Sequence, residues 1–269
     1  MLRNLVLKNF TMKILALIPA RMGSSRYPGK PMVSLLGIPM IEHVYRRVEL
    51  SSILTTTAVA TCDEEIAAHV RAIGGRVVMT GDHHERASDR CAEALEKIEK
   101  KDRVHYDIMV MVQGDEPTVY PEMIDDAVAP MKSDPSILVT NLLGEISTDV
   151  EFEDRNCIKV VCDCNGDALY FSREPIPTRF REIDIPMGKQ ICIIPFQRKF
   201  LLEYTHMSPT PLELAESIDM LRILENGKKV RMVPTFHNTQ AVDTESDRQR
   251  VEQMLFDDPL HKKLFLNNP

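Results

Sequence analysis

Three cationic side chains follow a short apolar segment near the start of the chain. Residues 14–18 read ILALI, and Arg21, Arg26 and Lys30 come after them in a loop that also holds Ser25. Prolines and glycines interrupt this loop repeatedly, so it cannot continue as a helix or a strand. Open α/β sheets bind ligands where their strands end, and cations, hydroxyls and backbone N–H groups bind anions. The loop therefore predicts a polyphosphate site, with a basic surface loop as the alternative.

Strand-like and helix-like patterns alternate after this loop. Strands are expected at 55–61, 77–79 and 108–112, and helices at 39–49, 64–73, 87–100 and 122–131. Strands that alternate with helices of about ten residues indicate βαβ units. We therefore predict an α/β fold, with a Rossmann-like, mostly parallel or mixed sheet between two layers of helices.

The second half of the chain has a different pattern. Residues 179–189 are polar and lack a clear period, which indicates a mobile loop near the substrate. The expected strands are 137–142, 158–161, 168–171, 190–194 and 230–233, with a hairpin turn at Asn165-Gly166, and the expected helices are 212–225 and 245–256.

Composition excludes several classes of function. The formal net charge of −7 over 269 residues argues against a surface for nucleic acid. No apolar run approaches the roughly 20 residues that cross a bilayer, and the first ten residues lack the features of a signal peptide. The six cysteines show no repeated C-x-x-C pair, which favours reduced thiols. We expect a cytoplasmic protein that binds neither nucleic acid nor membranes.

Two long motifs resemble a known enzyme family. They are IPARMGSSRYPGKP at residues 18–31 and DIMVMVQGDEP at residues 107–117, and shorter matches follow in GIPMIEHVYRR, VATCDEEI, ALYFSREPIP, PLELAESIDMLRIL and AVDTESD. These motifs are similar to those of the sugar-acid cytidylyltransferases, above all the CMP-KDO synthetase (3-deoxy-manno-octulosonate cytidylyltransferase) family. The resemblance begins near residue 12. It divides the chain into an N-terminal extension, residues 1–11, and one cytidylyltransferase domain, residues 12–269. Within this domain, residues 12–135 would bind the nucleotide, and residues 136–269 would bind the acceptor and form a homodimer.

The resemblance implies a fold of the nucleotide-diphospho-sugar transferase type and a specific reaction. CTP would be joined to the anomeric hydroxyl of a KDO-like 2-keto sugar acid, with release of pyrophosphate. The implied catalytic residues are Arg21, Lys30, Asp115 and Asp243. Asp115 and Asp243 would bind Mg²⁺, which prefers carboxylate oxygens. Each aspartate has a helix cap as its alternative role, and Asp243, with Thr244, precedes the helix predicted at 245–256.

The resemblance also assigns residues to the two substrates. The nucleotide would contact Ala20, Arg21, Ser25, Arg26, Lys30, Thr61, Asp63, Ser88 and Gln113, and the acceptor would contact Gln113, Arg173, Gln190 and Glu216. Asp63 is equally suited to cap the following helix. Arg173 suits bidentate binding of a carboxylate, with an exposed salt bridge as its alternative. Lys159 also matches a family lysine and has a structural role as its alternative.

The acceptor half departs from the family pattern. Arg86-Ala87-Ser88 stands where the family has S-G-T, and QICIIPF, residues 190–196, replaces H-x-G-I-Y-x-Y; Met220 replaces a polar amide. The lost imidazole and phenol would leave sugar hydroxyls unpaired, at roughly 1–3 kcal/mol for each buried group. We therefore hypothesise an acceptor other than KDO, such as an amino- or deoxy-sugar acid, another 2-keto sugar acid or a phosphonate.

Two other functions fit part of this pattern. A nucleotidyltransferase with another base or with a sugar-phosphate acceptor is one, and a panel of nucleotides would distinguish it. A regulatory protein that binds a nucleotide without turnover is the other. The presence of Lys30, Asp115 and Asp243 argues against that second function.

Overall fold

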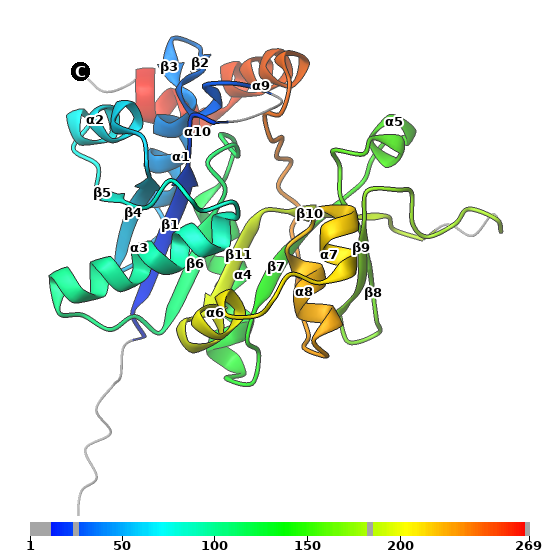
Figure 1. Ribbon diagram of the computed structural model, residues 1–269. Helices are drawn as coiled ribbons and strands as arrows, with labels where there is room; N and C mark the ends of the chain where they lie inside the picture. The colour runs from blue at the N-terminus through cyan, green and yellow to red at the C-terminus, as the bar shows by residue number, and fades with distance from the viewer. Residues whose placement is uncertain (1–11, 24–26, 182–184, 267–269) are drawn as a thin grey trace, which may run out of the picture.

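The first sheet contains the strands of the two long motifs, residues 18–31 and 107–117. The computed structural model describes residues 12–23, 27–181 and 185–266 (Figure 1). Its first sheet has the order β11-β6-β1-β4-β5, in which β11 is antiparallel to β6 and the other neighbours are parallel. The strands are β1 (Ile14–Ala20), β4 (Thr56–Thr61), β5 (Val77–Met79), β6 (Ile108–Val112) and β11 (Ile193–Gln197).

A second sheet continues beside β11. Its order is β12-β7-β10-β8-β9, with β12 parallel to β7 and the remaining pairs antiparallel. Its strands are β7 (Thr140–Glu145), β8 (Lys159–Cys162), β9 (Ala168–Ser172), β10 (Gly188–Ile191) and β12 (Arg231–Pro234). A bridge between Val139 and Phe196 joins the two sheets. The hairpin predicted at Asn165-Gly166 is confirmed, because it connects β8 to β9 with Gly166 at φ 81°.

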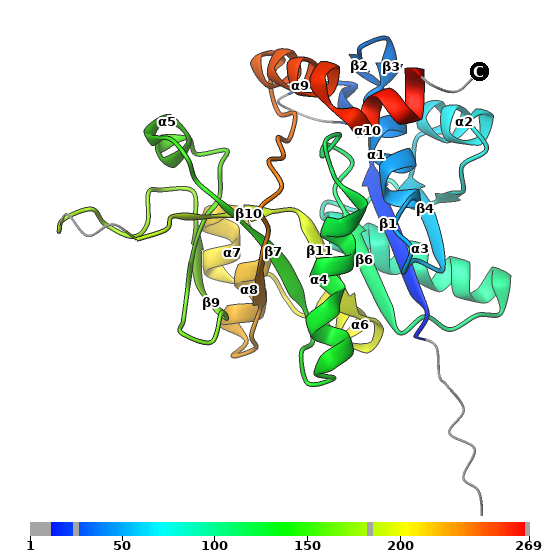
Figure 2. The ribbon, with the colours of Figure 1, turned by 180° about the vertical axis from the view of Figure 1, so that it is seen from behind.

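Helices cover both faces of this layer, as Figures 1 and 2 show from opposite sides. α3, α6 and α8 contribute to one hydrophobic core, and α1, α2 and α4 contribute to another. The helices are α1 (Met40–Glu49), α2 (Glu64–Ala72), α3 (Ala87–Asp102), α4 (Pro121–Ser133), α5 (Asp149–Glu153), α6 (Arg198–Thr205), α7 (Pro211–Glu216), α8 (Met220–Glu225), α9 (Glu245–Asp257) and α10 (Pro259–His261). The predicted three-layer α/β fold is confirmed.

β1 shows why this sequence gives three layers. All seven of its residues are buried, and successive side chains alternate between the two cores. Leu15 and Leu17 pack on the α3 side, whereas Ile14, Ala16 and Ile18 pack on the opposite side. A strand that is covered on both faces needs apolar residues at every position, as the run ILALI supplies.

The C-terminal helices α9 and α10 lie beside the hairpin that follows the cation-rich loop (Figure 1). A short hairpin, β2 (Ser34–Leu35) and β3 (Ile38–Pro39), follows the cation-rich loop and packs with α9. Leu35 and Met40 share a third core with Val242, Val251 and Leu255. Figure 1 accordingly draws α9 and α10 next to β2 and β3. None of the helices in the described part of the chain combines the length and the apolar character needed to cross a membrane.

Three predicted elements are wrong in their boundaries. The strand expected at 190–194 is divided between β10 and β11, which belong to different sheets. The helix expected at 212–225 is broken into α7 and α8 at Ser217, whose φ is 55°. The strand expected at 137–142 begins at Thr140. Each error arises where tertiary contacts interrupt a continuous apolar pattern, because periodicity does not record such contacts.

Candidate active site

Lys30 links the two predicted metal ligands. Its Nζ lies 2.6 Å from Asp115 Oδ2 and 2.9 Å from Asp243 Oδ1. The three side chains are only 14%, 26% and 17% exposed, respectively. Burial by itself would lower the pKa of Lys30, but the two carboxylates outweigh it and raise that pKa above its ordinary value. The ammonium group therefore stays charged between the two carboxylates.

Two distant segments bring these carboxylates together. Asp115 follows β6 at the carboxyl edge of the first sheet, and its backbone oxygen accepts a hydrogen bond from Val242 N at 3.0 Å. Thr244 is the N-cap of α9, where its side chain accepts from Asp247 N. The alternative of Asp243 as the helix cap is therefore wrong, and its carboxylate is directed to Lys30 instead.

The pair of carboxylates suits a divalent cation. Both already contact one cationic group, although they come from separate elements. Mg²⁺ is commonly held by one or two protein carboxylates together with phosphate oxygens and water. Within residues 12–23, 27–181 and 185–266, no group of three or more His, Cys, Asp or Glu side chains forms a larger metal site. The donor set therefore fits Mg²⁺ bound jointly by protein and nucleotide.

Glu116 is the buried neighbour of this site. Its residue surface is 6% exposed, and burial, with a contribution from Asp115, raises its pKa to about 8. A carboxyl group with such a pKa carries its proton at neutral pH. It therefore adds no further negative charge beside Asp115.

Part of the cation-rich loop is held by residues that follow β4 and by residues that precede α3. Met22 N donates to Asp63 Oδ2 at 2.8 Å, and Arg21 Nη1 donates to the His84 carbonyl at 3.4 Å. Asp63 occupies the N-cap position of α2, but its carboxylate makes no capping hydrogen bond to that helix. The capping alternative is therefore wrong for its side chain. Ser25 and Arg26 lie outside the described residues.

The predicted base and ribose contacts lie at neighbouring strand ends. Ala20 pairs with Thr61 in the parallel register of β1 and β4. Both residues are buried, and Thr61 Oγ1 accepts from Asp63 N at 3.1 Å. Gln113 follows β6, where its backbone N–H donates to the Cys192 carbonyl at 3.2 Å. These positions share the edge of the sheet that carries Asp115.

Ser88 requires a correction. Its residue surface is fully buried at the start of α3, and its hydroxyl donates to Asp219 Oδ2 at 3.3 Å. A contact from Ser88 to the nucleotide is not part of this arrangement, because the hydroxyl is enclosed between α3 and the start of α8. Neighbouring Arg86 approaches the same carboxylate, with Nη1 3.1 Å from Asp219 Oδ1. The sequence did not predict that Asp219 contacts Ser88 and Arg86. Its only signal was an arginine at position 86, where the family pattern has a serine.

The acceptor-side residues form a second group. Glu216 accepts hydrogen bonds from Ser172 Oγ at 3.2 Å and from Arg173 N at 2.9 Å. The Arg173 guanidinium donates to the carbonyls of Glu216, Arg155 and Ser217 at 2.6, 2.8 and 3.4 Å. The alternative of an exposed salt bridge is therefore wrong, because the guanidinium binds the carbonyls at Arg155 and at residues 216–217 and so joins these two segments to the end of β9.

Two other acceptor-side residues have protein partners. Lys159 is fully buried and donates to the carbonyls of Asp154, Cys157 and Arg173 at 2.6–2.9 Å, which supports its structural interpretation. Gln190 is half-buried in β10, and its Nε2 donates to Asn141 Oδ1 at 2.6 Å.

The altered family positions are mostly in the core. Ile194, Phe196 and Met220 are between 0% and 3% exposed and belong to the core on the α3 side. They therefore do not line an acceptor surface in this structure. Gln190, Ile194 and Phe196 stand where the family pattern has a histidine and two tyrosines. Among these three residues, only Gln190 is partly exposed. This removes much of the basis for predicting an altered acceptor.

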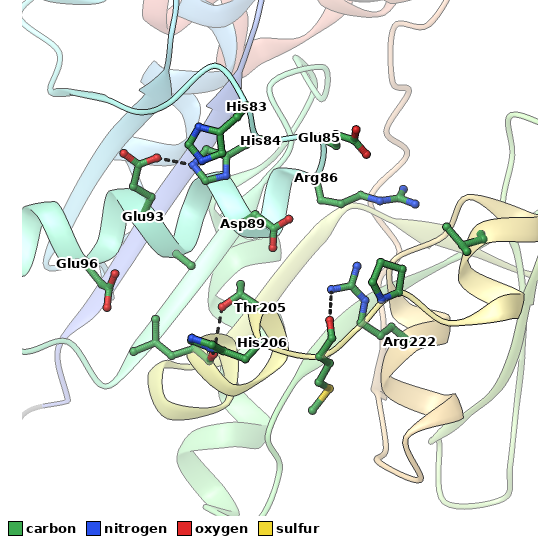
Figure 3. Close-up of a pocket in the computed structure, with 15 residues that line it drawn as sticks. His83, His84, Glu85, Arg86, Asp89, Glu93, Glu96, Thr205, His206 and Arg222 are labelled. Atoms are coloured by element: carbon green, nitrogen blue, oxygen red, sulfur yellow. Dashed lines mark hydrogen bonds and ion pairs between the residues drawn. The ribbon is translucent and has the colours of Figure 1, made fainter.

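A separate cavity of about 540 Å³ opens beside α3 (Figure 3). Its lining includes Arg86, Asp89, Glu93, His206 and Arg222. The predicted site residues are absent from its described lining. The cavity is therefore a neighbour of the candidate site and not its centre.

Comparison with known proteins identifies the class. The family model described as cytidylyltransferase matches residues 15–230. A solved structure of CMP:2-keto-3-deoxy-manno-octonic acid synthetase in complex with CTP is 34% identical, with a TM-score of 0.82 and coverage of 91% of this chain and 98% of that one. The chain belongs to the cytidylyltransferase family, and it is a nucleotidyltransferase.

Two curated relatives of this chain are named for one enzyme activity. The 3-deoxy-manno-octulosonate cytidylyltransferase of Geobacter metallireducens is 43% identical over 91% of this chain and 98% of its own length. The mitochondrial enzyme of that name from Arabidopsis thaliana is 38% identical over 92% of this chain and 85% of its own. A glucose-1-phosphate thymidylyltransferase structure, 17% identical with a TM-score of 0.62, shares the fold.

Proposed function

We propose that the protein transfers the CMP group of CTP to the anomeric hydroxyl of KDO, giving CMP-KDO and pyrophosphate. The Lys30–Asp115–Asp243 cluster at the carboxyl edge of the first sheet carries this proposal. It provides a cation and two metal-binding carboxylates beside the loop that holds Arg21. The names of relatives at 38–43% identity support the choice of KDO.

The protein contributes position and charge to the reaction. The anomeric hydroxyl gives up its proton to solvent, and its oxygen forms a new bond to the α-phosphorus. The bond from that phosphorus to the α–β bridging oxygen breaks, and pyrophosphate leaves with this oxygen. Arg21, Arg26 and Lys30 neutralise the β- and γ-phosphates, whose charge grows as pyrophosphate leaves. Mg²⁺ held by Asp115 and Asp243 would supply further neutralisation of phosphate charge. No covalent attachment to the protein is required.

The ends of β1 and β4 form the proposed nucleoside site. Ala20 and Thr61 offer backbone groups to cytosine and ribose at paired strand ends. Asp63 contributes by holding Met22 and thereby shaping the loop. Gln113 lies between the nucleotide and the acceptor, because β6 ends between these two parts of the chain.

The acceptor site is proposed around Gln113, Gln190, Arg173 and Glu216. The contacts of Arg173 assign it to fixing the Glu216 segment, with its cationic field available to the acceptor carboxylate. Gln190 presents an amide where the family has a histidine. The burial of Ile194 and Phe196 favours KDO over the altered acceptors considered from sequence.

The wider organisation remains part of the proposal. Residues 12–269 form one catalytic domain preceded by an extension, residues 1–11, and two copies associate as a homodimer in the cytoplasm. The division at residue 135 needs revision, because β11 and Asp243 lie on the nucleotide side although they come later in the chain.

The first test is pyrophosphate release from CTP and Mg²⁺ with KDO as acceptor. Mass analysis should find CMP-KDO, and reactions without acceptor, or with the Asp115→Asn variant, should remain at background. A panel of other nucleotides and of amino- or deoxy-sugar acids runs in parallel. A CMP adduct with another acid but not with KDO would overturn the proposed acceptor, and turnover of a different nucleotide would overturn the choice of CTP.

A further inference from the structure

Four charged side chains form an alternating chain beside α3. Arg222 binds Glu213 through two contacts of 2.6 Å, and Arg86 Nε lies 3.7 Å from Glu213 Oε1. Arg86 Nη1 then reaches Asp219 Oδ1 at 3.1 Å. The Glu213 and Arg222 side chains are 0% and 4% exposed, and those of Asp219 and Arg86 are 19% and 24% exposed. Such enclosure makes the loss of one member costly.

Arg86 joins this chain from the other half of the molecule. It is the N-cap residue of α3, which packs on β1 and β4 of the first sheet. The two acids that it contacts belong to α7 and the start of α8. In Figure 3 its side chain extends from the loop before α3 toward α7 and α8. Arg86 is therefore a link between the nucleotide side and the acceptor side.

The break between α7 and α8 is contacted from both sides. Arg86 Nη1 donates to Ser217 Oγ at 3.4 Å, and Arg173 Nη2 donates to the Ser217 carbonyl at 3.4 Å. Ser217 has a φ of 55°, which a residue with a side chain adopts only when its surroundings hold it there. Glu216, immediately before it, holds Ser172 and Arg173 N. The contacts of Arg86 thus end one residue from the proposed acceptor site.

We propose that Arg86 is a positioning residue for the acceptor, which acts by fixing the Ser217 break and thereby Glu216 and Arg173. This inference rests on the proposed function of that site. Arg86 makes no described contact with Lys30, Asp115 or Asp243, so we expect its main effect on the acceptor. It also gives a role to the arginine that stands where the family pattern has a serine.

The charges explain why Arg86 is needed. Without it, Glu213 would keep Arg222, but Asp219 would lose its cation and keep Ser88 as its described side-chain donor. Burial already raises the pKa of Asp219, which shows that its charged form is poorly solvated. The segment from Ser217 to Asp219 would then move to reach water. Neutralising Asp219 as well should relieve that movement.

The test compares Arg86→Met with Arg198→Met. Arg198 is a matched control, because its side chain is 25% exposed and it also links two elements, binding Glu99 of α3 from α6. Arg86→Met should raise the KM for KDO about tenfold or more and leave the KM for CTP within about twofold. Arg86→Lys should restore part of the affinity, as should Asp219→Asn combined with Arg86→Met. Arg198→Met should change neither KM.

A second measurement separates this inference from the proposed function. Hydrogen exchange without substrates should be faster in Arg86→Met around residues 172–174 and 213–219, but not in Arg198→Met. Unchanged exchange there, or equal changes in both KM values, would overturn the inference even when the enzyme is active. Faster exchange together with an inactive wild-type protein would support the link and overturn only the assigned reaction.

Discussion

The nucleotide side and the acceptor side use their cations differently. On the nucleotide side, Lys30 pairs with the side chains of Asp115 and Asp243. On the acceptor side, Arg173 and Lys159 donate mainly to backbone carbonyls. Side-chain partners can turn toward a ligand without rebuilding the fold, whereas a carbonyl network defines the path of the chain. The side-chain pairs of Lys30 therefore suit a reacting site, whereas the carbonyl contacts of Arg173 and Lys159 fix the loops of the acceptor side.

The largest effect is expected at Asp115. Asp115→Asn removes a charge from the cluster while it keeps the size of the side chain, so kcat should fall by about 10³-fold or more. Steady-state kinetics across a range of Mg²⁺ concentrations measures this loss. Asp126→Asn is the control, because Asp126 is exposed on α4. Activity close to wild type in Asp115→Asn would contradict the role of the nucleotide side.

Two lysines provide the most direct contrast. Lys30→Met should reduce kcat about 10²-fold, and because it leaves two largely enclosed carboxylates without their shared cation, it should also lower the free energy of unfolding by about 1–3 kcal/mol. Lys159→Met should leave kcat of the folded fraction close to wild type, but three carbonyls lose their donor inside the protein, so the free energy of unfolding should fall by about 2–4 kcal/mol. Urea unfolding and kinetics on the folded fraction test both variants. The contrast between the two sides would be wrong if both variants showed the same changes in kcat and in the free energy of unfolding.

A pH effect is expected where α1 meets the C-terminal segment. His43 is fully buried, its Nε2 contacts the Leu35 carbonyl, and its ring stacks on His261. Burial lowers the pKa of His43 from 6.5 to about 4. The unfolded chain therefore takes up this proton first as pH falls from 6.5 to 4, and the native state should lose up to about 3 kcal/mol.

Denaturant unfolding at pH 7, 5.5 and 4.5 tests this effect. His43→Gln keeps a donor for the Leu35 carbonyl and should flatten the pH dependence. Burial also lowers the pKa of His261, so the double variant with His261→Gln should be flatter still. A wild-type slope that survives in both variants would locate the acid sensitivity elsewhere.

The smallest effect is expected at Asp63. Asp63→Ala removes the acceptor for Met22 N and loosens the loop after β1, but it removes no phosphate contact. The KM for CTP should rise about two- to fivefold with little change in kcat. Calorimetric titration with CTP measures the binding change directly. A large fall in kcat would show that Asp63 acts on the chemistry rather than on the loop.

Sequence patterns predicted the structure correctly where the strands are regular and apolar. The apolar runs of β1 and β6 indicated that both strands are buried. Lys30 and Asp115 were assigned to one site through the family resemblance, and the structure brings them together because β1 and β6 are parallel and end at one edge of the sheet. Asp243 was expected there only from family resemblance, because more than one hundred residues separate it from Asp115 along the chain.

Long-range partners account for what sequence did not predict. The hydroxyl of Ser88 fits a nucleotide contact until Asp219 is seen beside it. Arg173 fits carboxylate binding until its three carbonyl acceptors are known. Nothing in the apolar pattern of residues 212–225 reveals that Ser217 breaks the helix. These contacts depend on how the two sheets meet, which local periodicity does not encode.

The position of β11 has a consequence for synthesis of the chain. β11 is the last strand of the first sheet to be made, and it covers the edge of β6. While the ribosome makes residues 113–192, the hydrogen-bonding edge of β6 has no native neighbour, and unpaired edges invite intermolecular pairing. Once β11 has left the ribosome, it pairs with β6 and removes this hazard within the same molecule. The yield of soluble protein in heterologous expression should therefore depend most on how fast residues 113–192 are translated and on the temperature of expression.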